Sequence, residues 1–115
     1  RASDMYISGG SNIYPREIEE KILTHGAITE VAVVGVPDPK WGEVGIAVCV
    51  PFDGADIDEA GLLAWMAERI ARYKLPKRVF FWDALPKSAY GKVPKMLVRQ
   101  ELERRGLLEG WEQKK

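Results

Sequence analysis

A basic loop near the end of the chain carries the residue with the clearest chemical potential. Residues 85–95 read LPKSAYGKVPK, and Lys92 follows a glycine inside this loop. Lysine is a compact positive charge on a long stem, so it can reach into a site on another surface and stabilise negative charge. The loop is not a P-loop, because Pro86 and Val93 stand where that motif requires a glycine and a serine or threonine. Local chemistry alone favours a solvated Lys92, as for most lysines.

Three other places could bind a ligand. The segment SGGSN contains Gly9 and Gly10, whose backbone N–H groups could hold a phosphate, although a plain turn is the simpler interpretation. Trp41 lies in the polar loop DPKWGE, either as a cover over the core or as a stacking surface for a ligand. Lys77 belongs to the basic cluster RYKLPKR, for which compensation of a helix dipole is favoured over phosphate contact.

The composition excludes several classes of site. The single cysteine, Cys49, and the single histidine, His25, rule out a disulfide framework and the usual zinc spacings, so we expect no metal site. Cys49 lies in an apolar stretch and should be inert, and the low cysteine content predicts a reducing, cytoplasmic location. The 17 basic and 17 acidic residues cancel, which gives no support to nucleic-acid binding. No apolar run approaches the ~20 residues of a membrane span.

The apolar pattern predicts the elements that must position these residues. A short strand and turn are followed by a helix that begins at Pro15 and ends near Gly26. The strand at 29–37, apolar at nearly every position, is typical of a central strand buried on both faces, and 44–52 is a second buried strand that should pair antiparallel with it. Asp58 is the expected N-cap of the next helix, and Gly106 the stop of the last one. The predicted strands cover 4–8, 29–37, 44–52 and 77–85, and the last helix covers about 94–105.

These elements predict a single α+β domain. We expect a small sheet of roughly three strands flanked by helices, with an N-terminal β-hairpin. Nothing in the chain repeats, and no segment is of low complexity.

Three segments together carry a resemblance to a known family. They are RASDMYISGGSNIYPREIEE at 1–20, VAVVGVPDPKWGE at 31–43 and YKLPKRVFFWDALPKSAYGKVPK at 73–95. In order and spacing they resemble the C-terminal domain of acyl-CoA synthetases, in the superfamily of adenylate-forming enzymes. The resemblance covers almost the whole chain.

The resemblance implies a two-step reaction. A carboxylic acid reacts with ATP to give an acyl-adenylate and pyrophosphate, and the thiol of CoA then displaces AMP. A large N-terminal domain, absent from this sequence, would bind the acid and ATP with its Mg²⁺. Residues 1–115 would be the mobile C-terminal domain, with a hinge region near 1–4, and its partner would be that N-terminal domain in cis. We expect the isolated chain to be inactive.

The resemblance also assigns roles to individual residues. Lys92 matches the lysine of the adenylation step, and Ser3 stands at the hinge position, where the family has aspartate or lysine. Arg1 is assigned to nucleotide binding. The residues assigned to the CoA channel and the CoA phosphates are Gly9, Gly10, Trp41 and Lys77.

The sequence leaves two other functions open. The chain could belong to an adenylating enzyme with another acceptor, such as a peptide-synthetase adenylation domain or an oxidative adenylating enzyme, although NIYPREIE and DPKWGE look more like CoA ligases. It could instead be a non-catalytic α+β binding module. The acid could be fatty, aromatic or short, because its pocket would lie in the other domain.

Overall fold

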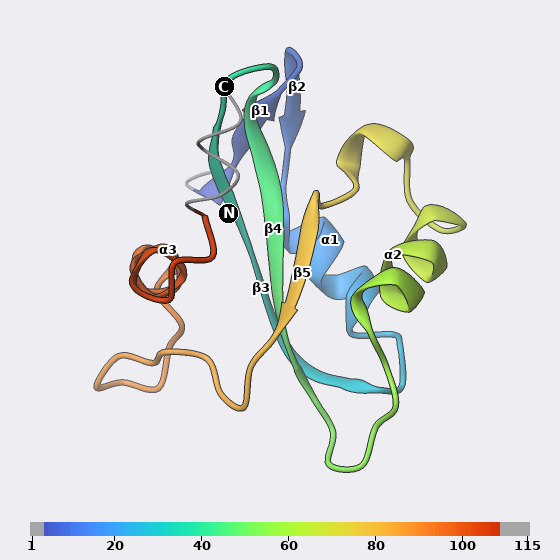
Figure 1. Cartoon of the computed structure of the whole chain (residues 1–115), viewed down its shortest axis with the longest axis vertical. Helices are drawn as coiled ribbons and strands as arrows, with labels where there is room; N and C mark the ends of the chain where they lie inside the picture. The colour runs from blue at the N-terminus through green and yellow to red at the C-terminus, as the bar shows by residue number, and fades with distance from the viewer. Residues whose placement is uncertain (1–3, 109–115) are drawn as a thin grey trace.

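The computed structural model describes residues 4–108, so the predictions for Arg1 and Ser3 lie outside the described residues. The elements follow the expected order (Figure 1). They are β1 (Tyr6–Ser8), β2 (Ser11–Ile13), α1 (Pro15–Ile22), β3 (Ile28–Asp38), β4 (Gly42–Pro51), α2 (Glu59–Ala67), the 3₁₀ helix η2 (Arg72–Lys74), β5 (Arg78–Phe81) and α3 (Lys95–Arg104).

The strands form one mixed sheet, which confirms the α+β fold class. The order is β2-β1-β4-β3, and β5 also pairs with β4. β3 and β4 are antiparallel over ten residue pairs, whereas β5 runs parallel to β4 because α2 lies between them in the chain. The N-terminal hairpin joins the same sheet through the pair Ser8 and Gly42, so residues 4–108 form one sheet of five strands rather than a sheet of three with a separate hairpin.

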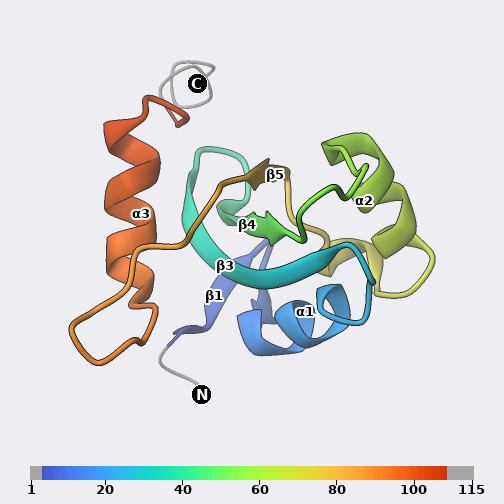
Figure 2. The same ribbon diagram turned by 90° about the horizontal axis from the view of Figure 1, so that it is seen from below.

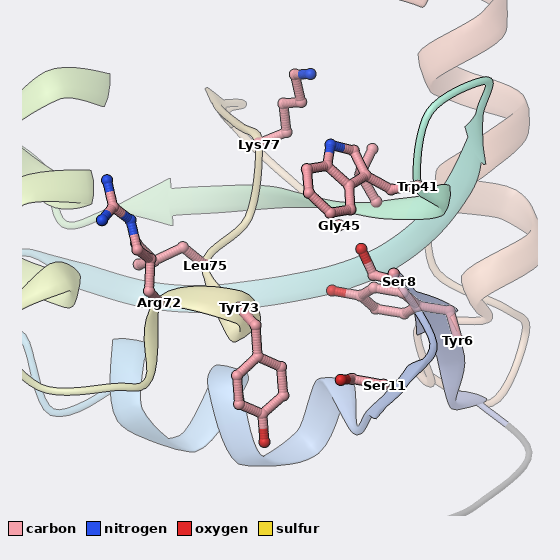
Figure 3. Close-up of a pocket in the computed structure, with 11 residues that line it drawn as sticks. Tyr6, Ser8, Ser11, Trp41, Gly45, Arg72, Tyr73, Leu75 and Lys77 are labelled. Atoms are coloured by element: carbon pink, nitrogen blue, oxygen red, sulfur yellow. The ribbon is translucent and has the colours of Figure 1, made fainter.

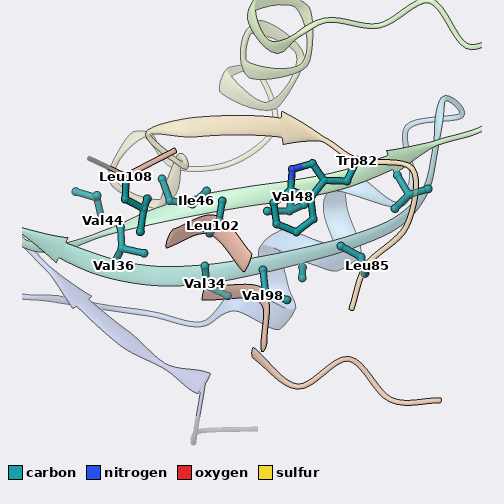
Figure 4. Packing of buried hydrophobic residues seen from close by; sticks show 12 residues of the cluster. Val34, Val36, Val44, Ile46, Val48, Trp82, Leu85, Val98, Leu102 and Leu108 are labelled. Atoms are coloured by element: carbon teal, nitrogen blue, oxygen red, sulfur yellow. The ribbon is translucent and has the colours of Figure 1, made fainter. Parts of the chain in front are cut away.

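Helices cover both faces of the sheet. In Figure 2, α3 lies on one side of the strands, and α1 and α2 lie on the other. The core is accordingly divided into two clusters. One packs α3 on β3 and β4 around Trp82 (Figure 4), and the other packs α1 and α2 around Tyr6 and Cys49. Because both faces are covered, β3 and β4 carry apolar residues at nearly every position.

The prediction of a central strand at 29–37 was wrong, because β3 lies at the edge of the sheet. Side chains, rather than another strand, satisfy backbone groups of its outer edge. Within the described residues, β4 is the only strand paired with β3. Val33 donates its N–H to the carboxylate of Glu19, at 2.8 Å, and its carbonyl accepts from Lys95, at 2.9 Å. The carbonyl of Gly35 accepts from Arg99 at 3.0 Å. These contacts satisfy edge groups that could otherwise pair with another chain.

Some of the predicted helix and strand ends are confirmed, and others were wrong. Asp58 is the N-cap of α2, since its carboxylate accepts from the N–H of Gly61 at 2.8 Å, and Gly106 follows α3 with a φ of 72°. The prediction that Gly26 ends the first helix was wrong, because α1 ends at Ile22 and three turn hydrogen bonds follow before Gly26. β5 is shorter than predicted: the chain leaves the sheet after Trp82 donates to the Cys49 carbonyl.

Candidate functional site

A pocket of about 580 Å³ lies between the β1–β2 hairpin and the segment from η2 to β5. Three of the residues singled out in the sequence, Gly9, Trp41 and Lys77, line it. Figure 3 shows Trp41 and Lys77 at its wall. Gly10 is next to the pocket in the chain but is not part of its wall. The complete lining is Tyr6, Ser8, Gly9, Ser11, Trp41, Val44, Gly45, Arg72, Tyr73, Leu75 and Lys77.

Trp41 forms one wall of this pocket, and its loop is held by local hydrogen bonds. The carboxylate of Asp38 accepts from the N–H groups of Lys40 and Trp41, at 3.0 and 2.9 Å. The N–H of Gly9 donates to the Trp41 carbonyl at 2.8 Å. With 45% of its surface exposed, Trp41 is not a cover over the core. The exposed position of Trp41 at the pocket wall favours the other interpretation, a surface on which a ligand could stack.

Gly9 is required beside Trp41 for two reasons. Its φ of 57° lies in the left-handed region, which disfavours side chains. A Cβ at this position would lie 2.8 Å from Cε3 of the Trp41 ring, well inside van der Waals contact. Gly10 has a φ of 86°, yet a Cβ there would meet nothing within 4 Å. The two neighbouring glycines therefore differ: one makes room for the tryptophan, and the other serves the turn.

Tyr6 forms the floor of the pocket and is 3% exposed. Its ring lies over two glycines of the sheet, since a Cβ on Gly35 would come within 2.5 Å of it and a Cβ on Gly45 within 2.1 Å of its hydroxyl oxygen. Burial, together with the negative charge of Glu43, raises the pKa of Tyr6 above its usual value. The hydroxyl therefore stays protonated near neutral pH and can donate a hydrogen bond.

The basic residues of the segment 72–78 point to different places: two form ion pairs outside the pocket, and two line the pocket. Lys74 pairs with Glu17 at 2.6 Å, and Arg78 pairs with Glu59 at 2.7 Å, both away from the pocket wall. Arg72 and Lys77 instead line the pocket, with Tyr73 between them in the chain. The helix-dipole explanation for the cluster was wrong for α2, because α2 ends at Ala67 with no basic residue in its last turn.

Sequence reasoning missed several residues of the pocket wall. Arg72 was visible only as one cation in a cluster, and Tyr73 stands directly after it. Tyr6, Ser8 and Ser11 belong to the hairpin that flanks the glycine pair, and no pattern in the sequence marked them as ligand contacts. In Figure 3, Trp41, Tyr6 and Ser8 lie on one side of the pocket, and Arg72, Tyr73 and Leu75 lie on the other.

Lys92 is not part of this pocket and belongs to the loop that connects β5 to α3. In Figure 1 this loop lies toward the end of the sheet away from the β1–β2 hairpin. The loop tip is a closed turn: the N–H of Ser88 donates to the Lys92 carbonyl at 2.8 Å, and that of Gly91 to the Ser88 carbonyl at 3.0 Å. Gly91 has a φ of 79°, and Tyr90 is 90% exposed. The turn thus presents Lys92 outward.

Of the three lysines in this loop, Lys92 is the unpaired one in the part of the chain that the structure describes. Lys87 forms an ion pair with Glu30 at 2.9 Å, and Lys95 forms one with Glu19 at 2.7 Å. The Lys92 ammonium is exposed and makes neither an ion pair nor a side-chain hydrogen bond with residues 4–108. Its charge is free to interact with another surface or a ligand.

Residues 4–108 hold neither a candidate metal-binding cluster nor a helix able to span a membrane. No group of three or more histidine, cysteine, aspartate or glutamate side chains in residues 4–108 could hold a metal ion. No helix in the same residues is long and apolar enough to cross a membrane.

The sequence matches a known family over much of its length. The profile of the AMP-binding enzyme C-terminal domain family matches residues 17–92, which is more than half of the chain. The chain belongs to this family. The match includes Trp41, Lys77 and Lys92, so it covers one part of the pocket wall and most of the lysine loop, whereas the β1–β2 hairpin precedes it.

Individual relatives agree with this assignment. A feruloyl-CoA synthase from Amycolatopsis is 53% identical over 100 residues, which cover 87% of this chain and 20% of the relative. An indoleacetate–CoA ligase from Aromatoleum aromaticum is 51% identical over 95% of this chain and 21% of its own length. The crystal structure of apo MatB from Rhodopseudomonas palustris superposes with a TM-score of 0.86 at 42% identity, over 90% of this chain and 21% of that one. The chain therefore spans about a fifth of the proteins it matches.

Proposed function

We propose that this chain is the C-terminal domain of an ATP-dependent, AMP-forming carboxylate–CoA ligase. It would work with a large N-terminal domain in cis, and residues near 1–4 would form the hinge, with Arg1 contributing to nucleotide binding and Ser3 at the hinge position. Family membership and relatives about five times as long support this arrangement. The substrates would be a carboxylic acid, ATP and CoA.

One observation carries the proposal: the domain keeps its two candidate sites apart. Gly9, Trp41 and Lys77 meet at a pocket, and an unpaired Lys92 stands on a different loop. A domain that serves two successive reactions in two poses needs two such surfaces. A single-site binding module has no need for the second one.

Lys92 would serve the adenylation step. When the acid carboxylate attacks the α-phosphate of ATP, negative charge builds on both groups. An ammonium placed between them would hold the two reactants together and stabilise that charge. The exposed turn supports this role, because it leaves the ammonium without a competing partner in residues 4–108.

The pocket would serve thioester formation. The indole of Trp41 would offer an apolar face for the pantetheine arm of CoA, and the backbone at Gly9 would let the arm pass closely, with Gly10 in the turn at the entrance. Lys77 and Arg72 would face the negatively charged phosphates of CoA. The neutral hydroxyl of Tyr6 adds a hydrogen-bond donor at the floor.

Mg²⁺ would enter with the phosphates of ATP and be held mainly by the N-terminal domain. A reducing, cytoplasmic setting fits a single buried cysteine without a disulfide partner.

The proposal is tested on the full enzyme that contains this domain. Ferulate, indoleacetate and a long-chain fatty acid are screened first for pyrophosphate release with ATP. Lys92→Ala should lower that release without CoA by about 10²-fold or more, because it removes a transition-state charge contact. Thioester formation from supplied acyl-adenylate and CoA should change by less than about threefold.

Lys87→Ala is the matched control in the same loop. Its pair with Glu30 is exposed by about 40% on both sides, so its loss should affect either step by less than about twofold. Equal losses in both steps for Lys92→Ala would contradict the assigned role. Carboxylate-dependent pyrophosphate production by residues 1–115 alone would contradict the two-domain arrangement.

A further inference from the structure

Lys95 stands at the centre of a network that joins four parts of the chain. Its ammonium lies 2.7 Å from the Glu19 carboxylate on α1, 2.9 Å from the Val33 carbonyl on β3 and 3.6 Å from the Asp4 carboxylate. Glu19 also accepts the N–H of Val33, so the two side chains bind both backbone groups of one residue at the β3 edge. Lys95 itself is the first residue of α3.

This network is better placed to fix the Lys92 loop than the ion pair at the loop's other end. The side chains of Lys95 and Glu19 are only 16% and 18% exposed, and both are hydrogen-bonded to backbone. Lys87 and Glu30 are 40% and 39% exposed. Exposed pairs contribute little, whereas a sheltered, hydrogen-bonded charge holds its partners firmly. The position of the loop is therefore set mainly at Lys95.

The connection from Lys95 to Lys92 is short and stiff. Only Val93 and Pro94 lie between them, and the ring of Pro94 fixes its φ near −69°. Val93 packs against the core cluster under α3. The Lys92 carbonyl accepts a hydrogen bond from the N–H of Ser88, which closes the turn. A shift of Lys95 would therefore be passed on to Lys92.

We propose that Lys95 is a positioning residue for adenylation, an inference that rests on the proposed function of Lys92. It holds the base of the Lys92 loop to the β3 edge and α1. Through Asp4 it also holds that base to the segment where the chain enters the domain. The placement of the Lys92 ammonium relative to that entry is thus set by the partly buried cation of Lys95. A displacement of about 1 Å in such a group can cost about 10²-fold in rate.

The experiment compares Lys95→Met with Arg99→Met in the full enzyme. Both changes remove a cation on α3 that donates to a carbonyl of β3, so both should lower the unfolding temperature, Lys95→Met by more because Glu19 also loses its ion pair. Lys95→Met should lower CoA-independent pyrophosphate release by about tenfold or more. It should change thioester formation from supplied acyl-adenylate by less than about threefold. Arg99→Met should change neither step by more than about twofold.

Conservative changes give a second readout. Lys95→Arg keeps a cation that can reach the same oxygens and should restore most of the adenylation rate. Lys95→Gln keeps a donor for the Val33 carbonyl but no charge, and it replaces Lys95→Met if that variant does not fold. It should show the same selective loss.

Two results would overturn the inference. One is an unchanged adenylation rate in Lys95→Met or Lys95→Gln. The other is a parallel loss in both steps, in proportion to the lowered unfolding temperature and shared by Arg99→Met, which would make Lys95 purely structural. Lys92→Ala is measured alongside: if it spares adenylation, the proposed function fails, whereas if it alone impairs adenylation, only the role of Lys95 fails.

Discussion

Replacing Gly9 with alanine should weaken CoA binding through Trp41. The new Cβ would lie 2.8 Å from Cε3 and 3.2 Å from Cζ3 of the Trp41 ring. Because that ring is about half exposed, it can swing away rather than force the backbone apart. The left-handed φ of 57° adds a conformational cost of about 1–2 kcal/mol to the folded state.

The size of the effect on binding follows from the displaced ring. Each CH₂ group of the pantetheine arm that loses its contact with the indole costs about 0.8 kcal/mol, which corresponds to a rise of about fourfold in the apparent KM for CoA. The assay is thioester formation by the full enzyme from supplied acyl-adenylate at varied CoA. Adenylation without CoA should stay within about twofold of the unmodified enzyme, because Lys92 is on a different loop.

Gly54 provides the matched control for the backbone strain. Its φ is 80°, and an added Cβ would meet nothing within 4 Å. It lies in the turn after β4 and is not part of the pocket wall. Gly54→Ala should lower the unfolding temperature about as much as Gly9→Ala while leaving the KM for CoA unchanged. An unchanged KM in Gly9→Ala, or an equal rise in both variants, would refute the assigned contact between Trp41 and CoA.

Two further predictions concern titrating groups. Burial raises the pKa of the Cys49 thiol to about 12, so at pH 8 it should react with a disulfide reagent only as fast as the domain opens, and rapid native-state labelling would contradict this. Hydrogen bonds from Arg104 and then Arg105 lower the pKa of Glu101 to about 2 from 4.5. Its stabilising effect is present above pH 4.5 and is lost as the pH falls toward 2, so Glu101→Gln should flatten the decline of the unfolding temperature over that range, and an unchanged decline would argue against these contacts.

The two central strands could be predicted from the sequence because their pattern is local. β3 and β4 are apolar at nearly every position, and they are buried on both faces as expected. The same pattern did not reveal that β3 lies at the edge of the sheet. Apolar side chains report which faces are covered, whereas the edge is made of backbone groups, which every residue carries. Its closure depends on Glu19, Lys95 and Arg99, which are distant in sequence.

The end of the first helix was less predictable. A glycine after an apolar stripe is a common stop, and it holds at Gly106 but not at Gly26. After Ile22 the chain makes a series of turn hydrogen bonds through His25 instead. His25 also accepts from the N–H of Ala27 and packs edge-on against Trp65 of α2. The contact between His25 and Trp65 thus helps to fix the chain after α1, where a glycine cap was expected.

The sequence by itself determined the family, the fold class and the candidate residues, because motifs, caps and apolar periodicity are properties of neighbouring positions. The tertiary structure decided which candidates act together. Gly9 meets Trp41 only because the hairpin joins β4 at Ser8 and Gly42. Lys92 is singled out from its loop only because acidic residues on α1 and β3 occupy its two neighbouring lysines. Contacts between residues far apart in the chain depend on strand register and helix packing, and neither is encoded in a local pattern.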